Sequence, residues 1–332
     1  MKVKKYFIIA AVLLLAVLVV IFVYQQNERN AGILPENPYV ERIEGDIDLA
    51  RYQPFTENNR LVRMEEPPNI TFTENFPIVD GATAAVPVYM AMVQEIYVGL
   101  DADTVGKYAM TSTTDLAFTR LINGEVDIFF GAQPSKWQIQ DAADRGVEFV
   151  LTPVAREAFV FFVHKNNPVD SLTVEQIQDI YQRNIVNWRD VDGRSGRILA
   201  FQRPENSGSQ TIMQAMVMRD KPLATPLMEE TARIMGDIIY QVATYRNYDQ
   251  AIGYSFRYFA TVMNPNDNIK LLAINGIEPT LENIRNGTYP FTVDVYAITA
   301  GSTNENVDTL IQWIVSEQGQ SFIETVGYVR RH

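Results

Sequence analysis

One short segment gathers hydroxyl and guanidinium groups where a strand gives way to a helix. Residues 203–211 read RPENSGSQT, after the apolar residues 198–201 and before apolar positions at helical spacing. Ser207, Gly208 and Ser209 fall at the expected helix start, where free N–H groups and the positive end of the dipole favour an anion. Arg203 would add a full positive charge with planar donors. Three interpretations of the segment are open at this point: an anion-binding turn, a nucleophile on a sharp turn, and a well-capped helix.

Two further segments repeat this design of strand, hydroxyl-rich turn and helix start. They are residues 81–83, Gly-Ala-Thr, and residues 112–114, Ser-Thr-Thr. In parallel α/β sheets such turns gather at the carboxyl ends of the strands, where ligands bind. A single such turn is more often only a helix cap, because Ser and Thr are common N-caps. The repetition, together with Arg203, predicts a mostly neutral cage for a small oxyanion.

Composition excludes several kinds of chemistry. The chain has no cysteine and two histidines, His164 and His332, so it offers neither a thiolate site nor a histidine-rich metal site. A nucleophile at Ser207 or Ser209 would depend on His164 and lacks the G-x-S-x-G setting. We therefore expect no metal, no cofactor and no enzymatic activity, with phosphoester hydrolysis as the less favoured alternative. The formal charge of −12 argues against nucleic-acid binding.

The N-terminal residues predict a membrane anchor. Lys2, Lys4 and Lys5 precede an apolar run at 6–24 that is long enough to cross a bilayer, so residues 1–24 are expected to form a single span with the N-terminus inside. A cleaved export signal is the alternative, and either places the body outside the cytoplasm. Residues 25–75 hold five prolines and little helical periodicity, which predicts an extracytoplasmic tether, although Tyr52 and Phe55 could pack against the body.

From residue 76 onward, strand patterns alternate with helix patterns, which predicts an α/β architecture with parallel sheets. Helices are expected after residues 83, 112, 173 and 207, and a polar helix at 226–247. Closing helices are expected at 309–315 and 320–326. Strands are expected at 77–79, 108–111, 126–130, 147–151, 158–163, 198–201, 251–254, 269–273 and 291–298.

Several of these segments together resemble one protein family. They are DGAT at 80–83, TSTTDLAFTRLINGEVDIFFGA at 111–132, RPENSGSQT, and residues 173–191 and 273–291. In this order they are similar to the phosphate ABC-transporter substrate-binding proteins, over residues 76–330. The resemblance implies a type II periplasmic-binding fold with two α/β lobes, a double-stranded hinge and a ligand between the lobes. Lobe 1 would comprise residues 76–158 and 288–332, and lobe 2 residues 159–287.

The resemblance also implies which residues hold the anion. The first loop would contribute Thr83 and Ala84, and the second would contribute Ser112 or Thr113, with the register open. The RPENSGSQT segment would contribute Arg203, Ser207, Gly208 and Ser209.

One position departs from the family pattern. The family commonly has an aspartate after the strand that ends at Phe130, and it accepts the proton of monohydrogen phosphate. This chain has Gln133 there or, with a short offset, Ser135. A glutamine penalises sulfate much less than a carboxylate does, so the choice between phosphate and sulfate stays open.

From these residues and the resemblance we expect a protein that binds a small anion and delivers it to a partner. We expect a monomeric, extracytoplasmic protein that closes two lobes over inorganic phosphate, or a similar tetrahedral oxyanion, and presents it to an ABC permease. The alternative is an anchored anion sensor or surface protein that keeps the binding fold without transport.

Overall fold

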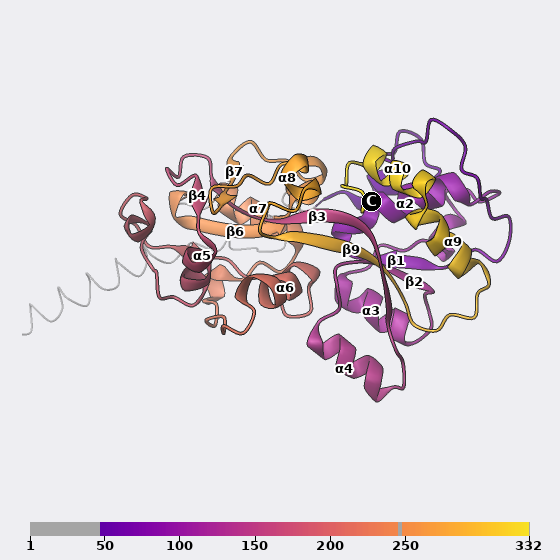
Figure 1. Cartoon of the computed structure of the whole chain (residues 1–332), viewed down its shortest axis with the longest axis horizontal. Helices are drawn as coiled ribbons and strands as arrows, with labels where there is room; N and C mark the ends of the chain where they lie inside the picture. Colours follow the sequence, from indigo (N-terminus) through magenta and orange to yellow (C-terminus); the bar gives the residue numbers. More distant parts are fainter. Residues whose placement is uncertain (1–46, 245–247, 332) are drawn as a thin grey trace, which may run out of the picture.

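The computed structural model describes residues 47–244 and 248–331. Two lobes lie side by side and are joined by the long strands β3 (Val150–His164) and β9 (Thr292–Thr299), as Figure 1 shows. The predicted anchor at 1–24 and the first part of the predicted tether, 25–46, lie outside the described residues. Within the described ranges, no helix has the length and apolar character needed to cross a membrane.

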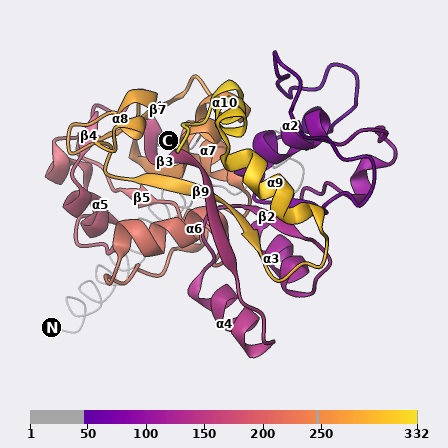
Figure 2. The ribbon, with the colours of Figure 1, turned by 45° about the vertical axis from the view of Figure 1, so that its right-hand side comes forward.

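The first lobe is a mixed sheet covered by helices on both faces. Its strands are β1 (Val79–Gly81), β2 (Ile128–Gly131), β9 and the first part of β3, in that order. One face carries the almost fully buried α2 (Val86–Ile96) with α9 (Asn306–Val315) and α10 (Glu317–Val326), and the other carries α3 (Thr114–Ile122) (Figures 1 and 2). Helix α4 (Lys136–Asp144) projects from the lobe beyond α3. The predicted strand at 108–111 forms only a single bridge, between Val79 and Ala109.

The second lobe continues the same seven-stranded sheet. The last part of β3 pairs with β6 (Ala251–Phe256) and β7 (Ile269–Leu271), and β5 (Leu199–Ala200) pairs with β6. Helices α5 (Val174–Tyr181), α6 (Gly208–Ile212), α7 (Met235–Thr244) and α8 (Leu281–Arg285) cover it. A short second sheet pairs β4 (Ser171–Leu172) with β8 (Ala273–Ile274). Of the polar helix expected at 226–247, the described residues up to 244 form a short 3-10 helix at Met228–Glu230 and α7, with a loop at 231–234 between them.

Strand β3 changes its partner between the lobes. Residues Val150–Ala158 pair with β9, whereas Phe159–Val163 pair with β6. The two strands expected at 147–151 and 158–163 are therefore one strand. The expectation of parallel sheets is wrong for this region, because β9 runs antiparallel to β2 and to β3, and β3 antiparallel to β6. A chain that crosses between lobes and returns must place its two crossing strands antiparallel. The residue bounds expected for the two lobes stay a prediction, and the change of partner between Ala158 and Phe159 supports the bound expected after residue 158.

The segment 47–75 packs on the folded body instead of standing apart from it. Tyr52 and Phe72 are buried in the main core, and the side chain of Asn59 donates to Gln94 Oε1 of α2 at 2.7 Å. The Arg60 guanidinium lies over the Tyr52 ring and donates to the backbone oxygen of Val262, beyond β6, at 3.0 Å. The described part of the predicted tether thus contacts both lobes.

Candidate functional site

A cavity of about 260 Å³ lies between the lobes, where the starts of α3 and α6 approach each other. Both helices lie on the same side of the connecting strands (Figures 1 and 2). Ala82, Thr83, Ala84, Thr113, Thr114 and Asp115 line the cavity from lobe 1, and Arg203, Pro204, Glu205, Ser207, Gly208, Ser209, Arg233, Ile234, Met235 and Phe256 line it from lobe 2.

The two helix starts present backbone donors to this space. Ser207 is the N-cap of α6 in an extended conformation, and its hydroxyl accepts from the backbone N–H of Gln210 at 3.4 Å. Thr113 is the extended N-cap of α3, and its hydroxyl makes no capping bond. The first N–H groups of a helix have no partner within the helix and sit at the positive end of its dipole. The cavity wall therefore favours an acceptor that carries negative charge.

A buried hydrogen-bond network fixes the turn that carries Arg203. The backbone N–H of Arg203 donates to Tyr254 Oη at 3.0 Å and to Gln210 Oε1 at 3.1 Å, and the Tyr254 hydroxyl donates to the same Gln210 oxygen. Tyr254 is fully buried, and this burial raises the pKa of its phenol well above the ordinary value, so it stays neutral. The sequence around β6 thus supports the turn that places the guanidinium in the cleft.

The structure brings most of the predicted site residues together. Thr83 and Ala84, Thr113, Arg203, and the run Ser207, Gly208 and Ser209 all line the cavity. Ser112 does not, although it is the neighbour of Thr113. Its backbone N–H donates to Asp80 Oδ1 at 2.9 Å, and its hydroxyl accepts from Arg120 Nη1 at 2.7 Å. Ser112 thus holds the loop against β1, and Thr113 is the residue of this pair that faces the cleft.

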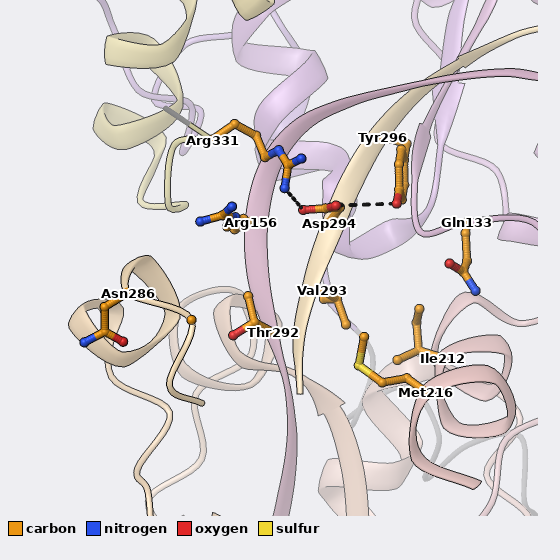
Figure 3. Close-up of a pocket in the computed structure, with 11 residues that line it drawn as sticks. Gln133, Arg156, Ile212, Met216, Asn286, Thr292, Val293, Asp294, Tyr296 and Arg331 are labelled. Carbon is orange, nitrogen blue, oxygen red and sulfur yellow. Dashed lines mark hydrogen bonds and ion pairs between the residues drawn. The ribbon is translucent and has the colours of Figure 1, made fainter. Parts of the chain in front are cut away.

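Gln133 lies outside this cavity. It lines a different hollow of about 400 Å³ beside β9, together with Asp294 and Arg331. Figure 3 shows Gln133 near Ile212 and Met216, whereas Arg331 donates to Asp294 Oδ1, at 2.8 Å, in another part of the hollow. The departure at Gln133 therefore does not determine the charge inside the cavity.

Some residues that line the cavity were not among the site residues predicted from the sequence. Asp115, Glu205 and Arg233 also line the cavity, and all three are exposed to solvent. Glu205 Oε1 accepts from the side chain of Gln214 at 3.4 Å. Asp115 was visible as an acidic residue in the first turn of a predicted helix, and Glu205 lies within RPENSGSQT. Arg233 was hidden because the polar pattern at 226–247 indicated a continuous helix. Phe256 is buried and also forms part of the wall.

The lobes touch beside the cavity. The Ser135 hydroxyl donates to Asn206 Oδ1 at 2.8 Å, which joins the start of α4 to the loop before α6. An added Cβ on Gly208 would lie 3.3 Å from Thr114 Oγ1, closer than most real Cβ contacts. A side chain at position 208 would therefore require Thr114 to shift by a few tenths of an ångström where the second lobe approaches the first. The two lobes are therefore already in contact at the edge of the cleft formed by the starts of α3, α4 and α6.

The site can bind a small oxyanion without any covalent step. Its donors are backbone N–H groups and hydroxyls from both lobes and two guanidinium groups from lobe 2. In the ranges 47–244 and 248–331, no group of three or more His, Asp or Glu residues is arranged to hold a metal ion. Two α/β lobes, paired crossing strands and a polar cleft between them define the class of two-lobed binding proteins.

Comparison with known proteins places the chain in a family. Residues 90–318 match the PBP superfamily domain, and the chain belongs to that superfamily. Protein SphX of Synechococcus elongatus is 26% identical over 266 residues, which cover 75% of this chain and 76% of that protein. The phosphate-binding protein PstS of Staphylococcus saprophyticus is 23% identical over 260 residues, covering 75% of this chain and 78% of PstS. These relatives confirm the family resemblance of the sequence motifs.

Solved structures show the same fold. A Clostridium perfringens protein, described as a phosphate ABC-transporter substrate-binding protein with bound phosphate, superposes with a TM-score of 0.59 at 23% identity and covers 77% of this chain and 99% of its own. An ABC-type phosphate transport receptor from Vibrio cholerae gives a TM-score of 0.56 at 18% identity, covering 76% and 99% of the two chains. The α/β periplasmic-binding fold expected from the resemblance is therefore confirmed.

Proposed function

We propose that this protein is an extracytoplasmic solute-binding protein that captures inorganic phosphate, or a similar tetrahedral oxyanion, for an ABC importer. The observation that carries the proposal is the cavity between the lobes, where Thr83, Thr113, Arg203 and the Ser207–Ser209 helix start converge from separate segments. The phosphate-binding names of its relatives support the choice of ligand.

The chemistry of the wall suits a small tetrahedral anion. Helix-start N–H groups and hydroxyls can donate to oxygens that point in different directions, and Arg203 can pair with two of them at once. Asp115 and Glu205 add acceptors, which favour an anion that still carries a proton and disfavour one that carries none. This composition favours phosphate over sulfate.

Binding, and not catalysis, is the proposed action. Ser207 caps α6 and none of the residues that line the cavity is a histidine, so its hydroxyl has no imidazole beside it of the kind that activates the serine of a Ser-His-Asp triad. The protein would act as a monomer, with its two lobes closing over the anion and presenting it to permease subunits.

We also propose that residues 1–24 anchor the protein in the membrane with the body outside the cytoplasm. Lys2, Lys4 and Lys5 before the apolar run, and the run's length, support this arrangement. Carbonate extraction of membranes from cells that express the full chain tests it. An anchored protein stays with the membrane pellet, whereas release of the whole population into the supernatant would contradict the anchor.

Calorimetry on the full chain in detergent micelles tests the ligand. Phosphate, sulfate, molybdate and a simple phosphonate are titrated separately at pH 8. We expect saturable binding of one phosphate per chain and at least about tenfold weaker binding of sulfate. Absence of binding heat with all four anions, and of any thermal stabilisation by them, would overturn the proposal.

A further inference from the structure

A buried carboxylate on the crossing strand has no part in the site described so far. Glu157 lies on β3, one residue before the strand's last pairing with β9, and is only 3% exposed. Its Oε1 accepts from the backbone N–H of Ala158 at 2.8 Å, and its Oε2 accepts from the backbone N–H of Tyr258 at 3.0 Å. The carboxylate thus joins the crossing strand to the start of the helical segment that follows β6 in the second lobe.

Glu157 and the anion cavity share a wall. A small hollow of about 20 Å³ next to Glu157 is lined by Ala82, Ala84 and Phe256, and the same three residues line the anion cavity. A second connection runs through Tyr328. Its hydroxyl donates to the backbone oxygen of Ala84, and its ring stacks on Tyr258 with the ring centres 4.6 Å apart. The first anion-binding loop is therefore packed directly against the surroundings of Glu157.

The charged groups around Glu157 lie too far away to form an ion pair with it, among the residues that the structure describes. Arg257, on the same turn as Tyr258, attracts the carboxylate only through space, and no ion pair of Glu157 within 4.0 Å occurs among the described residues. On the side of β9, Asp294 is paired with Arg331 at 2.8 Å. Burial raises the pKa of the phenols of Tyr258 and Tyr328, so both stay neutral. Tyr52 and Arg60 are the further titratable groups close enough to Tyr258 to affect its pKa. Burial likewise raises the pKa of Glu157 to about 7.

We propose that Glu157 takes up a proton when a phosphate dianion enters the cleft, so that the protein captures the anion and a proton together. The inference rests on the proposed function. A dianion placed across the shared wall adds negative charge near a carboxylate that is already desolvated, which favours its neutral form. By linkage, the neutral form of Glu157 favours the anion to the same extent. The proton comes from solvent and is returned to it when the anion leaves.

The test measures proton uptake directly. The full chain in detergent micelles is titrated with phosphate at pH 8, where phosphate is almost entirely a dianion, in two buffers with different heats of ionisation. We expect a net uptake of more than about half a proton per phosphate for the wild type, and an uptake near zero for Glu157→Gln, which still binds phosphate. Glu282→Gln, an exposed position on α8, serves as the matched control and keeps the wild-type uptake.

A second measurement uses the wild type alone, so it tests the inference even if the Glu157→Gln variant does not fold. Between pH 7.5 and 8.5 the phosphate dissociation constant should rise several-fold, because deprotonation of Glu157 opposes binding. Equal uptake by wild type and Glu157→Gln, or a pH-independent dissociation constant in the wild type, overturns the inference while phosphate binding itself stands. A wild type that binds no phosphate overturns the proposed function and this inference with it.

Discussion

At the level of single residues, the cavity combines opposite charges. Arg203 and Arg233 face the same space as Asp115 and Glu205, so the wall is not simply positive. Such a wall distinguishes anions that carry a proton from anions that carry none. A carboxylate accepts a hydrogen bond from a protonated oxygen of the anion and repels an unprotonated one.

Asp115→Asn tests this role of the carboxylate. The change keeps the shape of the side chain and removes its negative charge, so sulfate should lose a repulsion that phosphate does not feel. We expect the preference for phosphate over sulfate to fall by roughly tenfold, measured by competition calorimetry. Asp144→Asn, on the exposed end of α4, is the control. An unchanged preference would remove Asp115 from the account of selectivity.

Tyr254→Phe tests the network that holds the Arg203 turn. Loss of the hydroxyl leaves the Arg203 N–H with one fewer acceptor and the Gln210 oxygen with one fewer donor. We expect a loss of about 1–2 kcal/mol in the free energy of unfolding and several-fold weaker phosphate binding. Tyr97→Phe removes a comparable buried hydroxyl, bonded to the backbone oxygen of Pro77, and should cost stability without affecting binding. Equal binding losses in both variants would mean that the effect is not specific to the turn.

At the level of elements, the approach of α6 to α3 sets how far the cleft can close. Gly208→Ala puts a Cβ against Thr114 but improves helix propensity at the start of α6. We therefore expect phosphate binding to weaken by roughly tenfold while thermal stability is unchanged or slightly higher. Gly106→Ala, where an added Cβ meets open space, is the control. Normal binding by Gly208→Ala would show that this contact does not limit closure.

Sequence patterns predicted the site residues at the helix starts, but not those in the loops that complete the site. Thr113 and Ser207 were recognisable because a hydroxyl before an apolar helical pattern is a local signal. Arg233 lies in a loop whose position depends on how α7 packs on β6, which no local pattern records. Gln133 follows β2 as expected, yet the path of the chain into α4 turns it away from the cavity. The single strand β3 was read as two, because Arg156 and Glu157 interrupt its apolar pattern.

At the level of the whole molecule, Glu157 makes stability depend on pH. Burial raises the pKa of this carboxyl in the folded chain from 4.5 to about 7. Between these values the folded chain holds a proton that the unfolded chain has released, so this group's contribution to stability is lost as pH rises.

Urea unfolding of wild type and Glu157→Gln at pH 4.5 and pH 8 measures the effect. The variant should gain stability relative to the wild type by up to about 3 kcal/mol between the two pH values, because it has no carboxylate to desolvate. Glu282→Gln should show no such change. A stability difference between variant and wild type that is the same at both pH values would contradict the assignment.

The central claim is that the anion binds between the lobes at Arg203. Calorimetry with phosphate on the wild type, Arg203→Ala and the exposed control Arg189→Ala tests it most directly. We predict one phosphate per chain for the wild type and the control, and binding weakened by about a hundredfold or more in Arg203→Ala, since a charge-assisted donor pair is lost from a partly enclosed site. Phosphate binding of unchanged strength in a folded Arg203→Ala protein would contradict the account.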